Sequence, residues 1–128
     1  MTLDSSAIVA VICREPGYEE LLRKMTNARV LMIGAPTVAE CQLVLTIKLG
    51  RDGGAIVDQF LNEVRALIVP FGRDHISSFY EAFICFGKGR HPARLNMGDC
   101  FTYATAKVAG MPVLFTGGDF TLTDLKAA

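Results

Sequence analysis

Four acidic residues occur where alternating strands and helices would bring them to one edge of a parallel sheet. Asp4 follows the first apolar run, and Asp119 follows the last one. Glu40 and Asp99 each lie within the first turns of an expected helix. The carboxyl ends of parallel strands and the starts of the following helices share one edge, so these side chains are expected to meet. Carboxylates without a matching His or Cys cluster select hard cations, which predicts a Mg²⁺ or Mn²⁺ site that acts on a phosphate.

Each acid also has an ordinary structural explanation. Asp4 could cap the helix that follows it. The stretches Thr37–Glu40 and Asn96–Asp99 have the spacing of capping boxes, and Asp119 could be a turn residue after two glycines. The presence of all four acids at one sheet edge favours the metal site over separate caps. Two carboxylates ~4 Å apart repel by about 1 kcal/mol even in water, so such a cluster is unfavourable by itself. A bound divalent cation would remove that penalty.

Short apolar runs alternate with helical patterns along the chain. The expected strands are Met1–Leu3, Val30–Ile33, Ala66–Val69 and Val113–Phe115. The expected helices are Ser6–Cys13, Tyr18–Thr26, Pro36–Gly50, Ala55–Glu63, Asp74–Phe86 and Asn96–Ala109. Right-handed crossovers place helices on both sides of such a sheet. We therefore predict an α/β, three-layer fold with a central parallel sheet of four to five short strands, formed by residues 1–128 as a single domain.

The charge balance excludes a protein that binds nucleic acid through its overall charge. The chain has 13 basic and 13 acidic residues, so any such binding must be local. Half of the residues are apolar, a high share for a small domain that favours an oligomer or a stable complex.

Cysteine usage and the N-terminus point to the cytoplasm. The four cysteines form no C-x-x-C pair and lie in helical apolar patterns, which predicts reduced core residues. The longest apolar run, Ala7–Cys13, is too short to span a bilayer, and the N-terminus lacks the basic flank of a signal peptide. We expect a cytoplasmic protein with no membrane association.

Several sequence blocks together carry a family resemblance. They are Leu3–Ala7, Ala35–Glu40, the basic loop that runs through Gly87–Cys100, Leu114–Phe120, and Thr123-Asp124. In this order the blocks resemble the PIN-domain nucleases and, within them, the VapC-type ribonuclease toxins of toxin–antitoxin modules. The resemblance implies a PIN-like sheet, an acidic Mg²⁺ or Mn²⁺ pocket, cleavage of RNA (tRNA or rRNA being the candidate targets), a homodimer, and neutralisation by a cognate VapB-type antitoxin.

The resemblance also implies roles for individual residues. Asp4, Glu40 and Asp99 match the acidic core of the family's pocket. The hydroxyl of Ser6 resembles the one that helps to order this pocket, and Thr116 is a second supporting residue. Gly118 holds a position that is often acidic in the family, and Asp119 is the nearest substitute. Asp119 is therefore the expected fourth acid, with Asp124 as the alternative.

The basic loop would hold RNA phosphates close to these acids. Its candidate residues are Lys88, Arg90, His91 and Arg94. A solvated loop is the structural alternative, as is a salt bridge from Arg94 into the acidic pocket. We expect the antitoxin's C-terminal segment to cover the helix face around Phe79, Tyr80 and Phe83.

Two other functions compete with the ribonuclease. A PIN-like module could keep the fold and act only through protein contacts. A phosphoacceptor receiver domain has a similar size and an acidic pocket, but it needs an acid at the end of its third strand. Here that strand ends in Val69-Pro70, which argues against the receiver.

Overall fold

The computed structural model describes all 128 residues and contains a four-stranded parallel sheet with six helices. The strands are β1 (Thr2–Leu3), β2 (Met32–Gly34), β3 (Leu67–Val69) and β4 (Val113–Leu114). The helices are α1 (Ser5–Ile12), α2 (Tyr18–Asn27), α3 (Ala35–Leu49), α4 (Gly53–Glu63), α5 (Arg73–Phe86) and α6 (Met97–Ala109). The predicted fold class is therefore confirmed, and the element boundaries agree with those expected to within about two residues.

The strand order is β3-β2-β1-β4, with every neighbouring pair parallel. The chain first adds strands on one side of β1 and then crosses to add β4 on the other side. The crevice at such a reversal, beyond the carboxyl ends of the strands, is where open α/β sheets bind ligands. Asp4 follows β1 directly, so the topology places it at this point.

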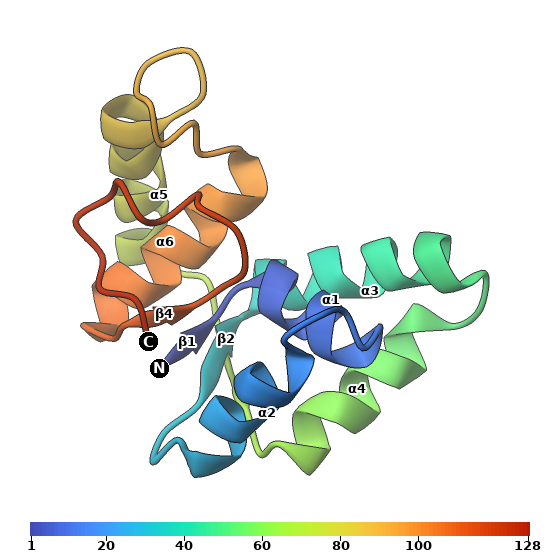
Figure 1. Cartoon of the computed structure of the whole chain (residues 1–128). Coiled ribbons are helices and arrows are strands. Elements are labelled where there is room, and N and C mark those ends of the chain that lie inside the picture. The colour runs from blue at the N-terminus through green and yellow to red at the C-terminus, as the bar shows by residue number, and fades with distance from the viewer.

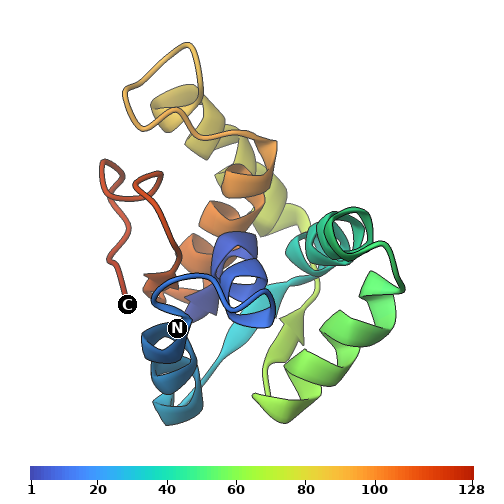
Figure 2. The same cartoon turned by 45° about the vertical axis from the view of Figure 1, so that its right-hand side comes forward.

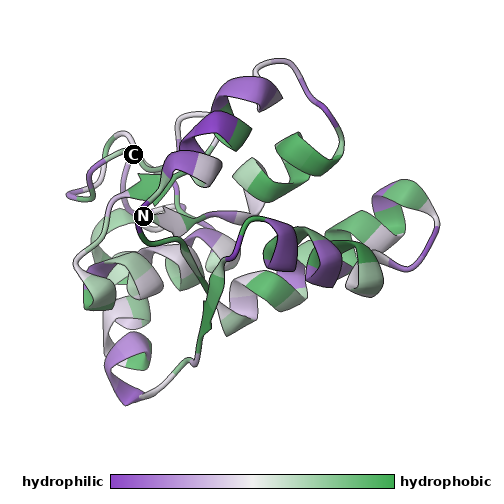
Figure 3. Cartoon of the chain, turned by 90° about the horizontal axis from the view of Figure 1, so that it is seen from below, coloured by the Kyte–Doolittle hydropathy of each residue, from purple (hydrophilic) through white to green (hydrophobic).

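The helices cover both faces of the sheet (Figures 1 and 2). One core lies between the sheet and helices α1 to α4 and contains Leu3 and Leu114. The second core lies under α5 and α6 and contains Val113 and Phe120. Neighbouring strand residues point to opposite faces, which is why Val113 and Leu114 enter different cores. The strand segments are mostly coloured as hydrophobic in Figure 3.

Glycine sets how closely α6 approaches the sheet. A Cβ at Gly34 would lie 2.4 Å from the Oγ1 atom of Thr105, so only glycine allows this contact between β2 and α6. The C-caps Gly50 and Gly110 end α3 and α6 in the left-handed conformation, with φ of 66° and 63°. The contact at Gly34 therefore holds the middle of α6 against β2.

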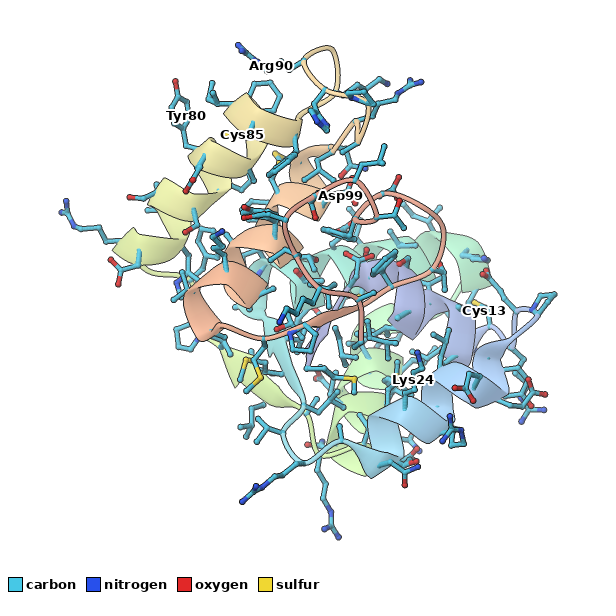
Figure 4. The ribbon with its side chains drawn as sticks, turned by 60° about the vertical axis from the view of Figure 1, so that its left-hand side comes forward. Cys13, Lys24, Tyr80, Cys85, Arg90 and Asp99 are labelled. Atoms are coloured by element: carbon cyan, nitrogen blue, oxygen red, sulfur yellow. The ribbon has the colours of Figure 1, made fainter.

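One expectation about the core was wrong in part. Cys41 and Cys100 are buried free cysteines as expected, but Cys85 is exposed on α5. On the same helix, Ile76 is 60 % and Tyr80 66 % exposed, so part of its apolar face meets solvent. Figure 4 shows Tyr80 projecting from α5 away from the rest of the molecule. Periodicity identified the helix, but it did not tell which of its apolar faces packs inside the molecule. No helix has the length and apolar composition needed to cross a membrane.

Candidate active site

Asp4 is fixed at the junction of β1 and α1. It caps α1, and its Oδ2 atom accepts hydrogen bonds from the backbone N–H of Ser6 at 3.0 Å and from the Ser6 hydroxyl at 2.5 Å. Its Oδ1 atom accepts a bond of 2.7 Å from the buried hydroxyl of Thr102 on α6. The helix cap expected for Asp4 is therefore present. Both carboxylate oxygens are held, and the side chain is only 4 % exposed.

Glu40 reaches the same edge from the second turn of α3. Its Oε1 atom accepts a long bond of 3.3 Å from the Ser5 hydroxyl, whereas Oε2 is buried with no hydrogen-bond partner. A Cβ at Gly98 on α6 would lie 2.7 Å from both oxygens, so glycine is needed for the carboxylate to fit there. Burial, followed by the negative charge of Asp4, raises the pKa of Glu40.

Asp99 lies in the first turn of α6, inside a reciprocal capping box with Asn96. The Asn96 Oδ1 atom accepts from the Asp99 N–H at 2.9 Å, and the Asp99 Oδ2 atom accepts from the Asn96 N–H at 2.8 Å. Burial is the largest cause that raises the pKa of Asp99 to about 6. The bond from Asn96 opposes it, and the negative charges of Asp4, Asp119 and Glu40 add to it.

The capping box expected for Thr37 and Glu40 is wrong. The N-cap of α3 is Gly34, so Thr37 lies inside the helix. Its hydroxyl is buried 3.4 Å from that of Thr102 and contributes to the polar support beneath Asp4. Glu40 is therefore not a capping residue, and the structure leaves its carboxylate at the sheet edge.

Ser6 and Thr116 connect the ends of β1 and β4. The Ser6 hydroxyl donates to Asp4 and accepts a bond of 3.0 Å from the backbone N–H of Thr116. Thr116 thus supports the site through its main chain. The carboxyl edges of the two strands are locked together at the point where the acids gather.

The two candidates for the fourth acid lie in different surroundings. Asp119 is exposed in the loop after β4, and its charge acts on Asp99. Figure 4 shows Asp99 beside the C-terminal segment that carries this loop. Asp124 instead accepts a bond of 2.7 Å from the Tyr103 hydroxyl and pairs with Lys107 further along α6. This geometry favours Asp119 over Asp124 as the fourth acid.

The donor set suits a hard divalent cation. All the converging groups are carboxylates, and the buried Glu40 Oε2 atom lacks any other partner. No three or more His, Cys, Asp and Glu side chains stand in a ready-formed metal cluster. The carboxylates that could hold a cation therefore lie at the carboxyl edge of the sheet, but they do not already form a complete set of metal ligands.

The basic loop, which precedes α6 in the chain, forms an open basin. Its volume is about 520 Å³, and its lining includes Lys88, Arg90, His91 and Arg94. The Lys88 N–H donates to Leu95 O and the Leu95 N–H donates to Phe86 O, which closes the base of the loop. The Arg90 guanidinium lies 5.2 Å from the centre of the Phe83 ring. The three ion pairs of the chain lie elsewhere, so the alternative salt bridge from Arg94 to the acids is not formed. The loop projects beyond α5 in Figure 2.

Sequence reasoning missed three hydroxyl residues at the site: Ser5, Thr37 and Thr102. Each is separated by three residues or fewer from a predicted acid or supporting residue on its own helix. That spacing places Thr102 near Asp99 on α6 and Thr37 near Glu40 on α3. Buried threonines one turn away from a predicted ligand are the signal that could have identified two of them.

Comparisons with known proteins agree with this architecture. The PIN domain family model matches residues 1–125. Ribonuclease VapC36 of Mycobacterium tuberculosis is 39 % identical over 127 residues, which cover 98 % of this chain and 91 % of the relative. Ribonuclease VapC of Mycolicibacterium smegmatis is 38 % identical, with 99 % and 98 % covered.

Solved structures show the same fold at low sequence identity. The crystal structure of Mycobacterium tuberculosis VapC20, described as a sarcin-ricin loop cleaving toxin, has a TM-score of 0.80 at 14 % identity and covers 99 % of this chain and 97 % of that one. The structure of VapBC2 from Rickettsia felis, bound to a DNA fragment from its promoter, has a TM-score of 0.74 at 17 % identity, with 99 % and 96 % covered.

The raised pKa of Asp99 predicts a pH-dependent stability when divalent cations are chelated. The folded pKa is about 6, against about 3.9 in the unfolded chain, so the folded state holds the proton more tightly. The contribution of Asp99 to stability is therefore lost as pH rises from about 4 to about 6, by up to about 2–3 kcal/mol. The free energy of unfolding, measured with urea at several pH values, should fall less with rising pH for Asp99→Asn than for the parent chain. The amide oxygen of this variant can still accept from the Asn96 N–H.

Asp58→Asn, on the outer face of α4, is the matched control and should keep the slope of the parent chain. If the free energy of unfolding changes equally with pH in the parent chain and in Asp99→Asn between pH 4 and 6, the electrostatic description of the site is wrong.

Proposed function

The chain belongs to the PIN-domain family and, within it, to the VapC ribonucleases, and from this we propose that it is a divalent-metal-dependent endoribonuclease. We further propose that it is the toxin of a toxin–antitoxin pair, that residues 1–128 form one PIN domain, and that it acts on RNA in the cytoplasm. One observation carries the proposal: Asp4, Glu40 and Asp99, from three separate parts of the fold, lie close enough for their charges to act on one another, and one buried oxygen of Glu40 has no partner.

Asp4, Glu40, Asp99 and Asp119 are the residues that would hold Mg²⁺ or Mn²⁺. When bound, the cation lowers the pKa of a coordinated water and neutralises charge that builds on the phosphate. The hydroxyls of Ser6 and Thr102 keep Asp4 from rotating. The free Oε2 atom of Glu40 could bind the cation directly or hold the attacking water beside it.

The basic loop supplies contacts to the RNA backbone in this proposal. Its cationic side chains have no acidic partner and lie ahead of Asp99 in the chain, so phosphates on one side of the scissile bond can rest there. The backbone closure between Lys88 and Leu95 holds the loop in a defined shape. An RNA strand held in this way would place one phosphodiester over the carboxylates.

Exposed apolar surfaces support the proposed partners. On α5, Ile76, Tyr80 and Phe83 are exposed, and we assign this face to the cognate antitoxin. On α3, Leu43 is 62 % and Ile47 75 % exposed, and we assign this second face to a homodimer. Exposed apolar patches of this kind mark protein interaction surfaces.

Substitution of the acids tests the ribonuclease. Asp4→Asn, Glu40→Gln and Asp99→Asn should each lower Mg²⁺-dependent RNA cleavage by about 100-fold or more, because each removes a ligand charge. Without metal the melting temperatures should stay equal or rise, since repulsion is relieved. Asp58→Asn should cleave as the parent chain does. A parent chain that binds its partner but never cuts RNA would favour the protein-binding module, whereas full activity in all three variants would refute the site.

The basic loop has its own test in the salt dependence of RNA binding. In an Asp99→Asn background, Arg90→Ala and Lys88→Ala should each reduce the slope of log K against log salt by about 0.7 for single-stranded RNA. Fluorescence anisotropy across a NaCl series measures this slope. Arg51→Ala, an exposed arginine between α3 and α4, serves as the control. Equal slopes for all four proteins would exclude a phosphate contact at the loop.

The two apolar faces are tested separately. Tyr80→Glu should keep RNA cleavage and self-association but escape inhibition by the antitoxin, because a charge enters its apolar contact. Ile47→Glu should instead yield a monomer by light scattering while inhibition persists. The assignments are wrong if Tyr80→Glu is inhibited normally or if the parent chain is already a monomer.

A further inference from the structure

The loop that carries Asp119 belongs to a C-terminal segment without helix, residues 115–128, that is tied down at several points. The end of the segment pairs with β4, where the Val113 N–H donates to Lys126 O and the Ala128 N–H donates to Val113 O, each at 2.9 Å. Phe120 is buried in the second core and only 2 % exposed. Figure 1 shows the segment lying across α6.

One face of α6 carries both an acid of the site and the groups that hold this segment. Asp99, Tyr103 and Lys107 follow one another at intervals of four residues, so they line one face over about 12 Å. The hydroxyl of Tyr103, a residue only 1 % exposed, donates to the Oδ1 atom of Asp124 at 2.7 Å, and Lys107 donates to Oδ2 at 2.5 Å. Asp124 is thus held by two of the three residues on this face.

The chain between Asp124 and Asp119 is stiffened by two consecutive turns. The Thr121 N–H and hydroxyl both donate to Gly118 O, at 3.1 and 2.6 Å. The Thr123 N–H and hydroxyl likewise donate to Phe120 O, at 3.1 and 2.8 Å. Few backbone torsions remain free across this stretch. The position of Asp124 therefore constrains where Asp119 lies relative to Asp99.

We propose that Tyr103, Lys107 and Asp124 form a latch that holds Asp119 beside Asp99, so that all three act as positioning residues for the fourth acid. The inference rests on the proposed metal-dependent ribonuclease. It also gives Asp124 a role distinct from metal binding. Asp124 orders the loop through its bonds to Tyr103 and Lys107 on α6, and Asp119 completes the pocket beside Asp99.

The protonation states at neutral pH suit such a latch. Burial, and then the bond to Asp124, raises the pKa of Tyr103, so its hydroxyl stays a donor. Burial alone would raise the pKa of Asp124, but the bonds from Lys107 and Tyr103 outweigh it and hold the pKa below its ordinary value. The carboxylate therefore remains an acceptor for both donors.

The test measures Mn²⁺ affinity of the full chain by calorimetry, which needs no RNA cleavage. Tyr103→Phe and Asp124→Asn should each weaken binding about tenfold, the loss typical when the support of a metal ligand is removed. In an Asp119→Asn background the same substitutions should change affinity by less than about twofold, because the latch acts only through Asp119. Glu15→Gln breaks an ion pair of similar exposure, with Lys48, and should bind Mn²⁺ as the parent chain does.

Melting temperatures separate positioning from general destabilisation. Latch variants that melt lower but bind Mn²⁺ like the parent chain would overturn the proposal, as would equal losses with and without Asp119. A parent chain that binds Mn²⁺ but does not cut RNA would contradict the proposed function and leave the latch result valid. A parent chain that binds no Mn²⁺ would overturn both.

Discussion

Mutual repulsion among buried carboxylates is the constraint around which this molecule is organised. Asp4, Glu40 and Asp99 come from three elements, and the pKa of both Glu40 and Asp99 is raised because burial and neighbouring negative charge disfavour ionisation. Such a cluster lowers stability unless something offsets it. Hydroxyl and backbone donors hold Asp4 and Asp99, whereas one oxygen of Glu40 has no donor at all. The divalent cation that we propose would offset this repulsion.

Helix α6 does most of the positioning. Its first turn presents Asp99, its next turn sends the Thr102 hydroxyl to Asp4, and Thr105 packs against Gly34 on β2. Tyr103 holds the C-terminal segment through its bond to Asp124. One helix therefore sets the distance between the sheet, the acids and the segment that carries the fourth acid, which explains why so many of its residues are buried.

The architecture was predictable from the sequence, and so was the choice of Asp4, Glu40 and Asp99 as candidate acids, but the residues that support these acids were not. Short apolar runs and helix-ending glycines are local signals, so the strands and helices were predicted nearly residue by residue. Asp4 is supported by Thr102, which lies 98 residues away in the chain. A local sequence pattern cannot show a contact between residues so far apart. Periodicity alone does not show whether the face of α5 that carries Ile76 and Tyr80 packs inside or meets a partner, and the structure shows that both residues are exposed. Asp119 was already expected ahead of Asp124, and the structure adds that Asp124 has a different partner, the Tyr103 hydroxyl.

If a divalent cation relieves carboxylate repulsion at this edge, Mn²⁺ must stabilise the folded chain. The melting temperature measured against Mn²⁺ concentration at pH 7 and pH 5 tests this. Binding to the folded state alone stabilises by RT ln(1 + [L]/Kd), about 2.7 kcal/mol at 100 times Kd. We predict a rise in melting temperature at pH 7 that shifts to higher Mn²⁺ concentration at pH 5, where the acids hold protons that the cation must displace. A melting temperature that does not respond to Mn²⁺ at pH 7, or that responds equally at both pH values, would contradict this account.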